Sequence, residues 1–336
     1  MEWVVGALGA LLAGIGVNAI YDIVKHGSAR VPQILRRSAL TREARDHDVE
    51  TDGLVTLVTW SKSRKLTPDR IETTYEGWSP RAHLFDEDVW HEQVESHRAR
   101  GDAGSTAYLT ALAVDHYESH AGQQFGIRVA ESDYAETLAT AQIYATDPEL
   151  KERLDTALAG PLDGFLDSVP PTSLTACVSV LSREGTVLLM RRSRTVRVFP
   201  AEWTVGINET MKYSAEPGAA ESLHAVAMRG LQEELSLTAA DLKSPEPLIT
   251  WLGWSRQSSS FATVNLVRSH LTEAEISERR GESHSVYEHD KMAWCPLRPR
   301  AISSIITGGK TPDGSHSWNY LAPLIALELW RSRTSL

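Results

Sequence analysis

Hydrophobic and polar positions follow different patterns along the chain. Residues 3–21 carry no charge and are mostly Val, Ala, Leu, Ile and Gly. The chain then changes to short apolar runs and longer amphipathic segments, separated by polar, Gly and Pro residues. These changes indicate a membrane anchor at 1–26, a basic juxtamembrane segment at 27–46, a mixed α/β middle region at 47–170 and a C-terminal region at 171–336. We therefore expect an α+β protein with one N-terminal transmembrane helix.

The uncharged segment is long enough to cross a membrane. Its about 19 residues, at ~1.5 Å each in a helix, nearly span a hydrocarbon core of roughly 30 Å. Trp3 and Tyr21 stand at its two ends, where aromatic side chains meet lipid headgroups. A signal peptide would begin with a positively charged region, whereas this chain begins with Met1 and Glu2. The alternative is a helix buried in a soluble core.

The charges that flank this segment predict its orientation. Basic residues follow it and none precedes it: Lys25, Arg30, Arg36, Arg37, Arg42 and Arg45. The positive-inside rule then places the rest of the chain in the cytoplasm, in a single-pass protein of the inner membrane. Gly6, Ala10 and Gly14 recur every four residues, a spacing that lets helices pack closely in lipid but also arises by chance.

The middle region is predicted to mix strands and helices. The strands are expected at 53–60, 70–75 and 127–130, and the helices at 87–98, 107–120, 132–146 and 148–166. Ser132 is the expected N-cap of the third helix, and Pro170 and Pro171 mark the end of the region.

The C-terminal region is predicted to alternate strands with one amphipathic helix. Strand-like runs are expected at 176–181, 187–190, from Trp203, at 248–254, at 261–267 and at 294–297, with the helix at 221–237. Leu223, Val226, Ala227, Leu231 and Leu235 form the apolar stripe of that helix.

The polar face of the same helix carries candidate chemistry. Glu221, Arg229 and Glu233 share this face at four-residue steps, and Glu234 follows directly. Paired carboxylates are ligands that Mg²⁺ prefers, and the metal can bridge to phosphate. The alternative is a solvated glutamate pair, the usual state of such dipeptides.

This segment resembles the Nudix box, G-x5-E-x7-R-E-U-x-E-E-x-G-U, where U is aliphatic. The positions that match are Glu221, Arg229, Leu231, Glu233, Glu234 and Leu237. The expected strands on both sides also occur as in Nudix domains. The resemblance covers about 172–336 and implies a Nudix-like α/β/α sandwich with a pocket for a nucleotide.

Three departures from the box weaken the implied chemistry. Gly230 replaces the glutamate after the arginine, which is a principal metal ligand in the family, Ser236 replaces the later glycine, and Ala215 replaces the first glycine. A lost ligand weakens magnesium binding and water activation. Glycine within a helix costs about 1 kcal/mol against alanine, which suggests either close packing or room for a bulky ligand. We therefore expect binding rather than cleavage.

The resemblance also implies the site residues. Glu233 and Glu234 would hold Mg²⁺ with a later acid, Glu288 or Glu282, and would be catalytic if the domain hydrolyses its ligand. The expected nucleotide-binding residues are Arg191, Arg192, Trp203, Glu209 and Arg229. Arg229 is equally expected to brace the helix through Glu233.

An anchor joined to a degenerate Nudix box resembles the transmembrane–Nudix effectors of cyclic-oligonucleotide anti-phage signalling systems (CBASS). That resemblance implies a cyclic nucleotide second messenger and a lipid bilayer as partners, homo-oligomeric assembly, and membrane disruption that kills the infected cell. Two alternatives stay open: a membrane-tethered Mg²⁺-dependent Nudix hydrolase of nucleoside diphosphate derivatives, and a structural membrane adaptor.

The net charge and the cysteines further limit the binding partners and the cysteine chemistry that we expect. The formal net charge of −10 argues against a nucleic-acid polymer, which needs a positive surface. The two cysteines, Cys177 and Cys295, lie in strand-like runs and are expected to be buried, reduced thiols.

Overall fold

The computed structural model describes residues 54–59, 71–76, 87–102, 104–115, 124–158, 172–196, 198–213, 221–283, 286–334 and 336. The chain divides into two units, Met1–Arg45 and Asp46–Leu336, and every described residue belongs to the second. The predicted anchor and the basic segment lie outside the described residues. Within the part that is described, no helix is long and apolar enough to cross a membrane.

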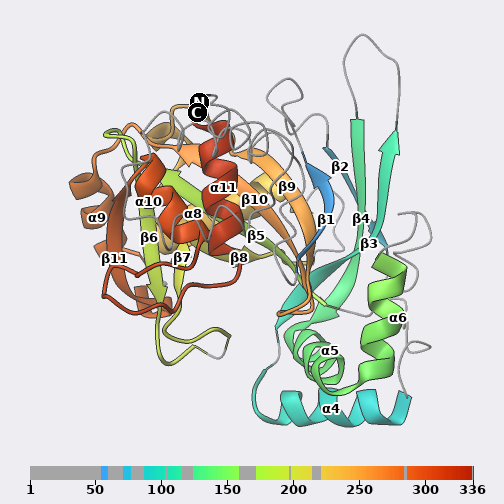
Figure 1. Ribbon diagram of the computed structural model, residues 1–336. Coiled ribbons are helices and arrows are strands. Elements are labelled where there is room, and N and C mark those ends of the chain that lie inside the picture. Colours follow the sequence, from blue (N-terminus) through green and yellow to red (C-terminus); the bar gives the residue numbers. More distant parts are fainter. Residues whose placement is uncertain are drawn as a thin grey trace, which may run out of the picture. The chain divides into compact units, whose positions relative to one another are not determined.

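The described residues contain an eight-stranded mixed sheet (Figure 1). Its order is β1-β9-β10-β5-β6-β11, with β8 paired to β5 and β7 paired to β6. The strands are β1 (Leu54–Thr59), β5 (Leu174–Leu181), β6 (Thr186–Arg192), β7 (Trp203–Val205), β8 (Ile207–Thr210), β9 (Leu248–Ser255), β10 (Ser260–Arg268) and β11 (His289–Pro296). Strands β10 and β5 are parallel, and the other pairs of this sheet are antiparallel.

Both faces of this sheet are covered. Strands β5 and β10 are buried at nearly every position instead of every second one, as expected when neither face meets water. Helix α8 (Leu223–Leu235) contacts β5 and β8, whereas α11 (Ala322–Ser332) contacts β5, β7 and β10. The buried side chains of α8 join the main hydrophobic cluster and those of α11 pack outside it, so the two helices cover the sheet from different sides.

Short helical elements complete this part. They are the α-helices α9 (Glu273–Gly281) and α10 (Pro299–Ile306) and the 3₁₀ turns η4 (Ala239–Asp241) and η5 (Val286–Glu288). Helix α10 packs against α11, and α9 packs against α8.

Helix α8 forms where the apolar stripe predicts it. The five stripe residues are all buried, which confirms the prediction. The Ser222 hydroxyl accepts a hydrogen bond from the Ala225 amide at 3.1 Å and caps the helix, so Glu221 lies just before it. Ser236 ends the helix in the left-handed conformation, φ 53°, that glycine adopts most easily. The serine therefore carries a small strain where the family pattern has glycine.

The middle region forms a second sheet and three described helices. The three-stranded sheet has the order β2-β4-β3, from β2 (Ile71–Glu76), β4 (Gln124–Asp133) and β3 (Ser105–Asp115). The helices are α4 (Glu87–Ala99), α5 (Tyr134–Thr146) and α6 (Pro148–Leu158). They share a core that includes Trp90, Val94, Ile143, Tyr144 and Leu150.

Two predictions for this region are wrong. The segment 107–115, expected in a helix, is the greater part of strand β3 and pairs antiparallel with β4. Its alanine and leucine content favours a helix, but pairing with a long neighbouring strand overrides that local preference. The N-cap of α5 is Asp133 and not Ser132, because the Asp133 carboxylate accepts from the Glu136 amide at 2.8 Å.

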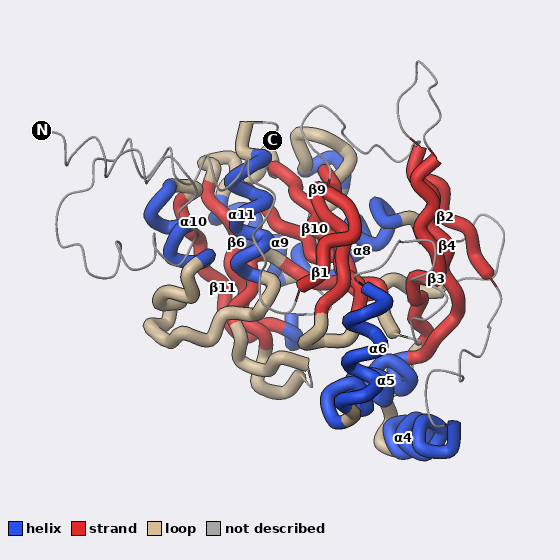
Figure 2. Tube along the Cα trace, turned by 45° about the vertical axis from the view of Figure 1, so that its right-hand side comes forward, coloured by secondary structure: helices blue, strands red, loops and turns tan. Residues whose placement is uncertain are grey.

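The middle region is built onto the C-terminal region within the same compact unit. Strand β1 extends the large sheet by pairing with β9 (Figure 2). Ile127 and Val129 of β4 belong to the same hydrophobic cluster as α8 and β5. The Tyr144 ring of α5 meets Trp254 of β9 edge to face, with centroids 6.4 Å apart. These contacts place α5 beside the sheet.

Candidate functional site

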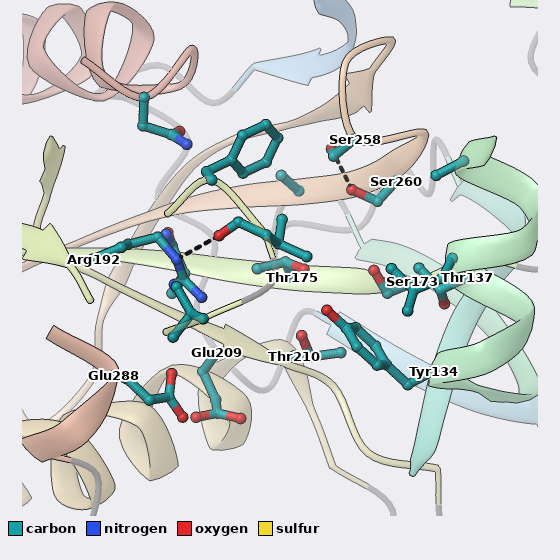
Figure 3. A pocket seen from close by; sticks show the side chains of 18 of the residues that line it. Tyr134, Thr137, Ser173, Thr175, Arg192, Glu209, Thr210, Ser258, Ser260 and Glu288 are labelled. Atoms are coloured by element: carbon teal, nitrogen blue, oxygen red, sulfur yellow. Dashed lines mark hydrogen bonds between the residues drawn. The ribbon is translucent and has the colours of Figure 1, made fainter. Parts of the chain in front are cut away.

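A cavity of about 760 Å³ lies where α5 faces the large sheet. One side is formed by β5, β8 and the end of β6, and the opposite side by the first two turns of α5 (Figure 3). The turn between β9 and β10 and the segment before α11 close it further. The cavity is large enough for a nucleotide-sized ligand.

The charged side of the cavity is made by Arg192, Glu209 and Glu288 (Figure 3). Arg192 ends β6, and its Nε donates to the Val198 carbonyl at 3.0 Å. Among the described residues no ion pair joins Arg192 to a carboxylate, although its charge lowers the pKa values of Glu234, Glu288 and Glu202 against the effect of burial. Burial raises the pKa of Glu288, and the nearby Glu234 raises it further.

Hydroxyl groups line much of the remaining wall. They come from Ser173 just before β5, Thr175 of β5, Thr210 of β8, Ser258 of the β9–β10 turn, Ser260 of β10, and Tyr134 and Thr137 of α5. The Ser258 hydroxyl is hydrogen-bonded to Ser260 at 2.6 Å and to Tyr320 at 2.7 Å, so that cluster is satisfied internally. The wall can both donate and accept hydrogen bonds.

Arg229 braces the helix and does not line the cavity. Its Nε donates to Glu221 at 2.5 Å and its Nη1 to Glu209 at 2.5 Å, while Nη2 donates to the Thr210 carbonyl at 2.7 Å. Glu233 is a more distant partner at 3.6 Å. These contacts tie the strand β8 and the residues before α8 to the helix. Of the two expectations for Arg229, the geometry favours the structural one.

Gly230 is a site of close packing. A β-carbon built at Gly230 would lie 2.8 Å from the β-carbon of Glu209 and 3.4 Å from Ile207. The Glu209 side chain thus fills the space that a side chain at Gly230 would need. Burial raises the pKa of the Glu209 carboxyl to about 7, although Arg229 opposes the shift. The Glu209 carboxyl of β8 therefore lies next to Gly230, the position that a glutamate occupies in the Nudix box.

Glu234 is buried against a histidine. Its carboxylate lies 2.9 Å from Nδ1 of His289, and both side chains are almost fully buried. Burial raises the pKa of Glu234 to about 8 and lowers the pKa of His289 to about 3, so both neutral forms are favoured.

The two adjacent acids Glu233 and Glu234 differ in their surroundings. Glu233 is half-exposed and lies within ion-pair distance of Lys212, at 3.7 Å, and of Arg229. Both carboxyl oxygens of Glu234 are buried without a hydrogen-bond partner among the described residues, although Nδ1 of His289 lies 2.9 Å away. Among the described residues, no three His, Cys, Asp or Glu side chains are grouped to hold a metal ion. Mg²⁺ is usually held by one or two carboxylates together with waters and substrate phosphates, so Glu233, Glu234 and Glu288 do not by themselves form a complete magnesium site.

Two expected nucleotide ligands lie elsewhere. The Arg191 guanidinium is held by Asp290, at 2.8 and 2.6 Å, and by Asp313, at 2.9 Å, and lies outside the cavity lining. Trp203 is only 1% exposed and packs in the core, so its ring cannot stack on a base in this cavity. Successive residues of a strand point to opposite faces, which explains why Arg192 reaches the cavity and Arg191 does not.

His289, Tyr134, Thr137 and the serine and threonine wall were not expected from the sequence. No spacing pattern connects α5 to the C-terminal region, so only the packing of the two regions brings these groups together. Cys177 also lines the cavity: it is fully buried, as expected, and burial raises the pKa of its thiol to about 12. Cys295 is a free thiol that is only partly buried.

No protein-family profile matches the sequence, and a comparison with curated proteins finds no match. Solved structures do resemble it. A MutT protein from Methanosarcina mazei Go1 is 17% identical over 49% of this chain and 96% of its own, with a TM-score of 0.30. A mutT/nudix family protein from Listeria innocua is 16% identical over the same shares, also at 0.30. A NUDIX hydrolase from Alicyclobacillus acidocaldarius is 16% identical over 40% of this chain and 83% of its own, at 0.26. These similarities are distant, and each covers about half of this chain or less.

Proposed function

We propose that this protein binds a nucleotide in the cavity beside α5 and acts as a sensor, without efficient hydrolysis. Polar groups differ in whether they face the cavity, and this difference supports the proposal. Arg192 and the hydroxyl wall face the cavity, whereas Arg229 is held by Glu221 and Glu209, and Glu233 and Glu234 do not line the cavity. Such a site can hold a phosphate and a base but lacks a formed metal shell.

The charge of the cavity supports a phosphodiester ligand. Arg192 is the only cationic side chain among the described lining residues, and it shares the cavity with the carboxyls of Asp102, Glu209 and Glu288. A nucleoside diphosphate without a metal would bring two or more close negative charges toward those acids. Each phosphodiester of a cyclic nucleotide carries one charge, and the two phosphates of a cyclic dinucleotide are apart, so Arg192 can balance one of them without a second charge beside it. We therefore propose a cyclic nucleotide second messenger as the ligand class.

The wider role follows from the sequence. We propose that ligand binding assembles several copies and brings their predicted anchors together in the bilayer, as in CBASS effectors. The uncharged segment 3–21 and the small residues Gly6, Ala10 and Gly14 support this step. The result would be membrane disruption and arrest of the infected cell.

Binding and product analysis on the purified full-length protein test the proposal. Thermal unfolding is measured with cyclic dinucleotides and with linear nucleoside diphosphates, with and without Mg²⁺. A bound ligand at a hundredfold excess over its dissociation constant stabilises the folded state by about 2.7 kcal/mol. Arg192→Gln should weaken binding at least about tenfold, because a charge-assisted hydrogen bond contributes about 1.5–3 kcal/mol. Arg194→Gln is the matched control, since Arg194 is exposed and does not line the cavity.

The alternative is a Mg²⁺-dependent Nudix hydrolase. The nearness of several carboxyls favours it: Glu209, Glu234 and Glu288 each sit in the field of a neighbouring glutamate. Robust Mg²⁺-dependent turnover of nucleoside diphosphate derivatives by the wild-type protein would establish this alternative and overturn the sensor proposal.

A further inference from the structure

We infer that helix α5 of the middle region reads the base of the ligand, with Tyr134 and Thr137 as specificity-determining residues. This inference rests on the proposed nucleotide binding and deepens it. It assigns a function to a part of the chain outside the Nudix-like region.

The two sides of the cavity differ in chemistry (Figure 3). The sheet side carries the charges of Arg192, Glu209 and Glu288, whereas α5 presents Tyr134, Thr137, Leu138 and Ala141. Asp102, which follows α4 and is hydrogen-bonded to His97 at 3.1 Å, also lines the cavity. A nucleotide has the same division, with an anionic phosphate and a neutral, flat base. With the phosphate at Arg192, the base extends toward α5.

The α5 side offers groups suited to a base. Leu138 and Ala141 provide apolar surface for its face, and the Tyr134 hydroxyl can donate to or accept from its edge. The Thr137 hydroxyl donates to the Asp133 carbonyl at 3.4 Å and can accept from the base. The Tyr134 hydroxyl forms no hydrogen bond to another described residue, in contrast to the paired hydroxyls of Ser258 and Ser260. Burial raises the pKa of Tyr134, so it stays a neutral hydrogen-bonding group.

The first turn of α5 is held rigidly. Asp133 caps it, and the Arg98 guanidinium binds Asp133 Oδ2 through two nitrogens at 2.9 and 2.6 Å. Farther along the helix, Tyr144 packs against Trp254 of the sheet. Tyr134 follows the cap directly and Thr137 lies one turn later on the same face. A fixed wall discriminates between bases because it cannot adjust to the wrong hydrogen-bonding edge.

Equilibrium binding to the full-length protein tests the inference. The probes are three cyclic dinucleotides, with two purines, two pyrimidines, or one of each. Tyr134→Phe and Thr137→Val should change the ratio of affinities for the purine and pyrimidine probes by about tenfold, the effect of about 1.4 kcal/mol. Arg192→Gln should lower all three affinities by a similar factor, because the phosphate is common to the probes.

Matched controls make the same chemical changes on the same helix. Tyr144→Phe and Thr146→Val remove a hydroxyl from α5 outside the cavity lining and should leave the affinity ratio unchanged. Thermal unfolding of each variant reports that it is folded. If the wild-type protein binds none of the probes, the proposed function falls. If it binds but Tyr134→Phe and Thr137→Val leave the ratio as in the wild type, the proposed function stands and the role of α5 is refuted.

Discussion

Gly230 and Glu209 pack directly against each other. The loss of the box glutamate at position 230 leaves a space on α8, and the Glu209 side chain from β8 occupies it. Glu209 is in turn held by Arg229. Restoring a glutamate at position 230 alone would therefore bring two side chains into one volume, so the substitution cannot simply rebuild the family's metal site.

Gly230→Ala should destabilise the protein by about 1–3 kcal/mol, the usual cost of overpacking, despite the gain of about 1 kcal/mol in helix propensity. Thermal unfolding of the purified protein measures the effect. Gly281→Ala is the control, because a β-carbon at Gly281, the last residue of α9, has no neighbour within 4 Å. The cost of Gly230→Ala should shrink in a Glu209→Ala background. An unchanged stability of Gly230→Ala would contradict the packing argument.

At the scale of elements, α5 depends on its N-terminal cap. Asp133 accepts from the Glu136 amide, and Glu136 accepts from the Asp133 amide at 3.3 Å, which forms a capping box. Arg98 adds an ion pair from α4. The cap and the ion pair together fix where the helix begins, and hence where Tyr134 points.

Asp133→Ala should cost about 1–2 kcal/mol, because it removes the cap and the ion pair together. Asp133→Asn keeps a side-chain acceptor for the cap and loses only the charge, so it should cost less than about 1 kcal/mol. Denaturant unfolding compares the two variants. Equal costs would mean that the ion pair with Arg98, and not the cap, holds the first turn.

At the scale of the whole molecule, the cavity belongs to neither region alone. The sheet supplies the charged side and α5 the neutral side, within the unit Asp46–Leu336. The proposed function adds the anchor as a third part, whose activity requires assembly in a membrane.

Expression of the full-length protein together with a cyclic nucleotide synthase should stop growth and depolarise the membrane. A form without residues 1–26 should not, because assembly of the remaining domains reaches no lipid. Growth curves and a potential-sensitive dye measure the outcome. The matched control is the full-length Arg192→Gln protein, which keeps the anchor but should bind the messenger weakly. Equal toxicity of the full-length and anchorless forms would refute the effector mechanism.

The sequence by itself determined the features that follow from short-range pattern. The strands around 176–190 and 248–267, the amphipathic helix α8 and its buried stripe depend on local periodicity. Arg192 and Glu209 were also expected in the site and do line the cavity. Glu221 was expected on the same helix face as Arg229; it lies before the helix and accepts a hydrogen bond from Arg229.

Only the tertiary structure decided the rest. The segment 107–115 forms strand β3, because its pairing with β4 outweighs its helix propensity. Trp203 is buried and Arg191 points toward Asp290, because the pairing of β6 and β7 in the sheet decides which way their side chains point. The tertiary structure also brought Tyr134 and Thr137 across from another region to face Arg192. A single sequence holds no periodic signal for contacts between residues so far apart, and the cavity exists only where those contacts meet.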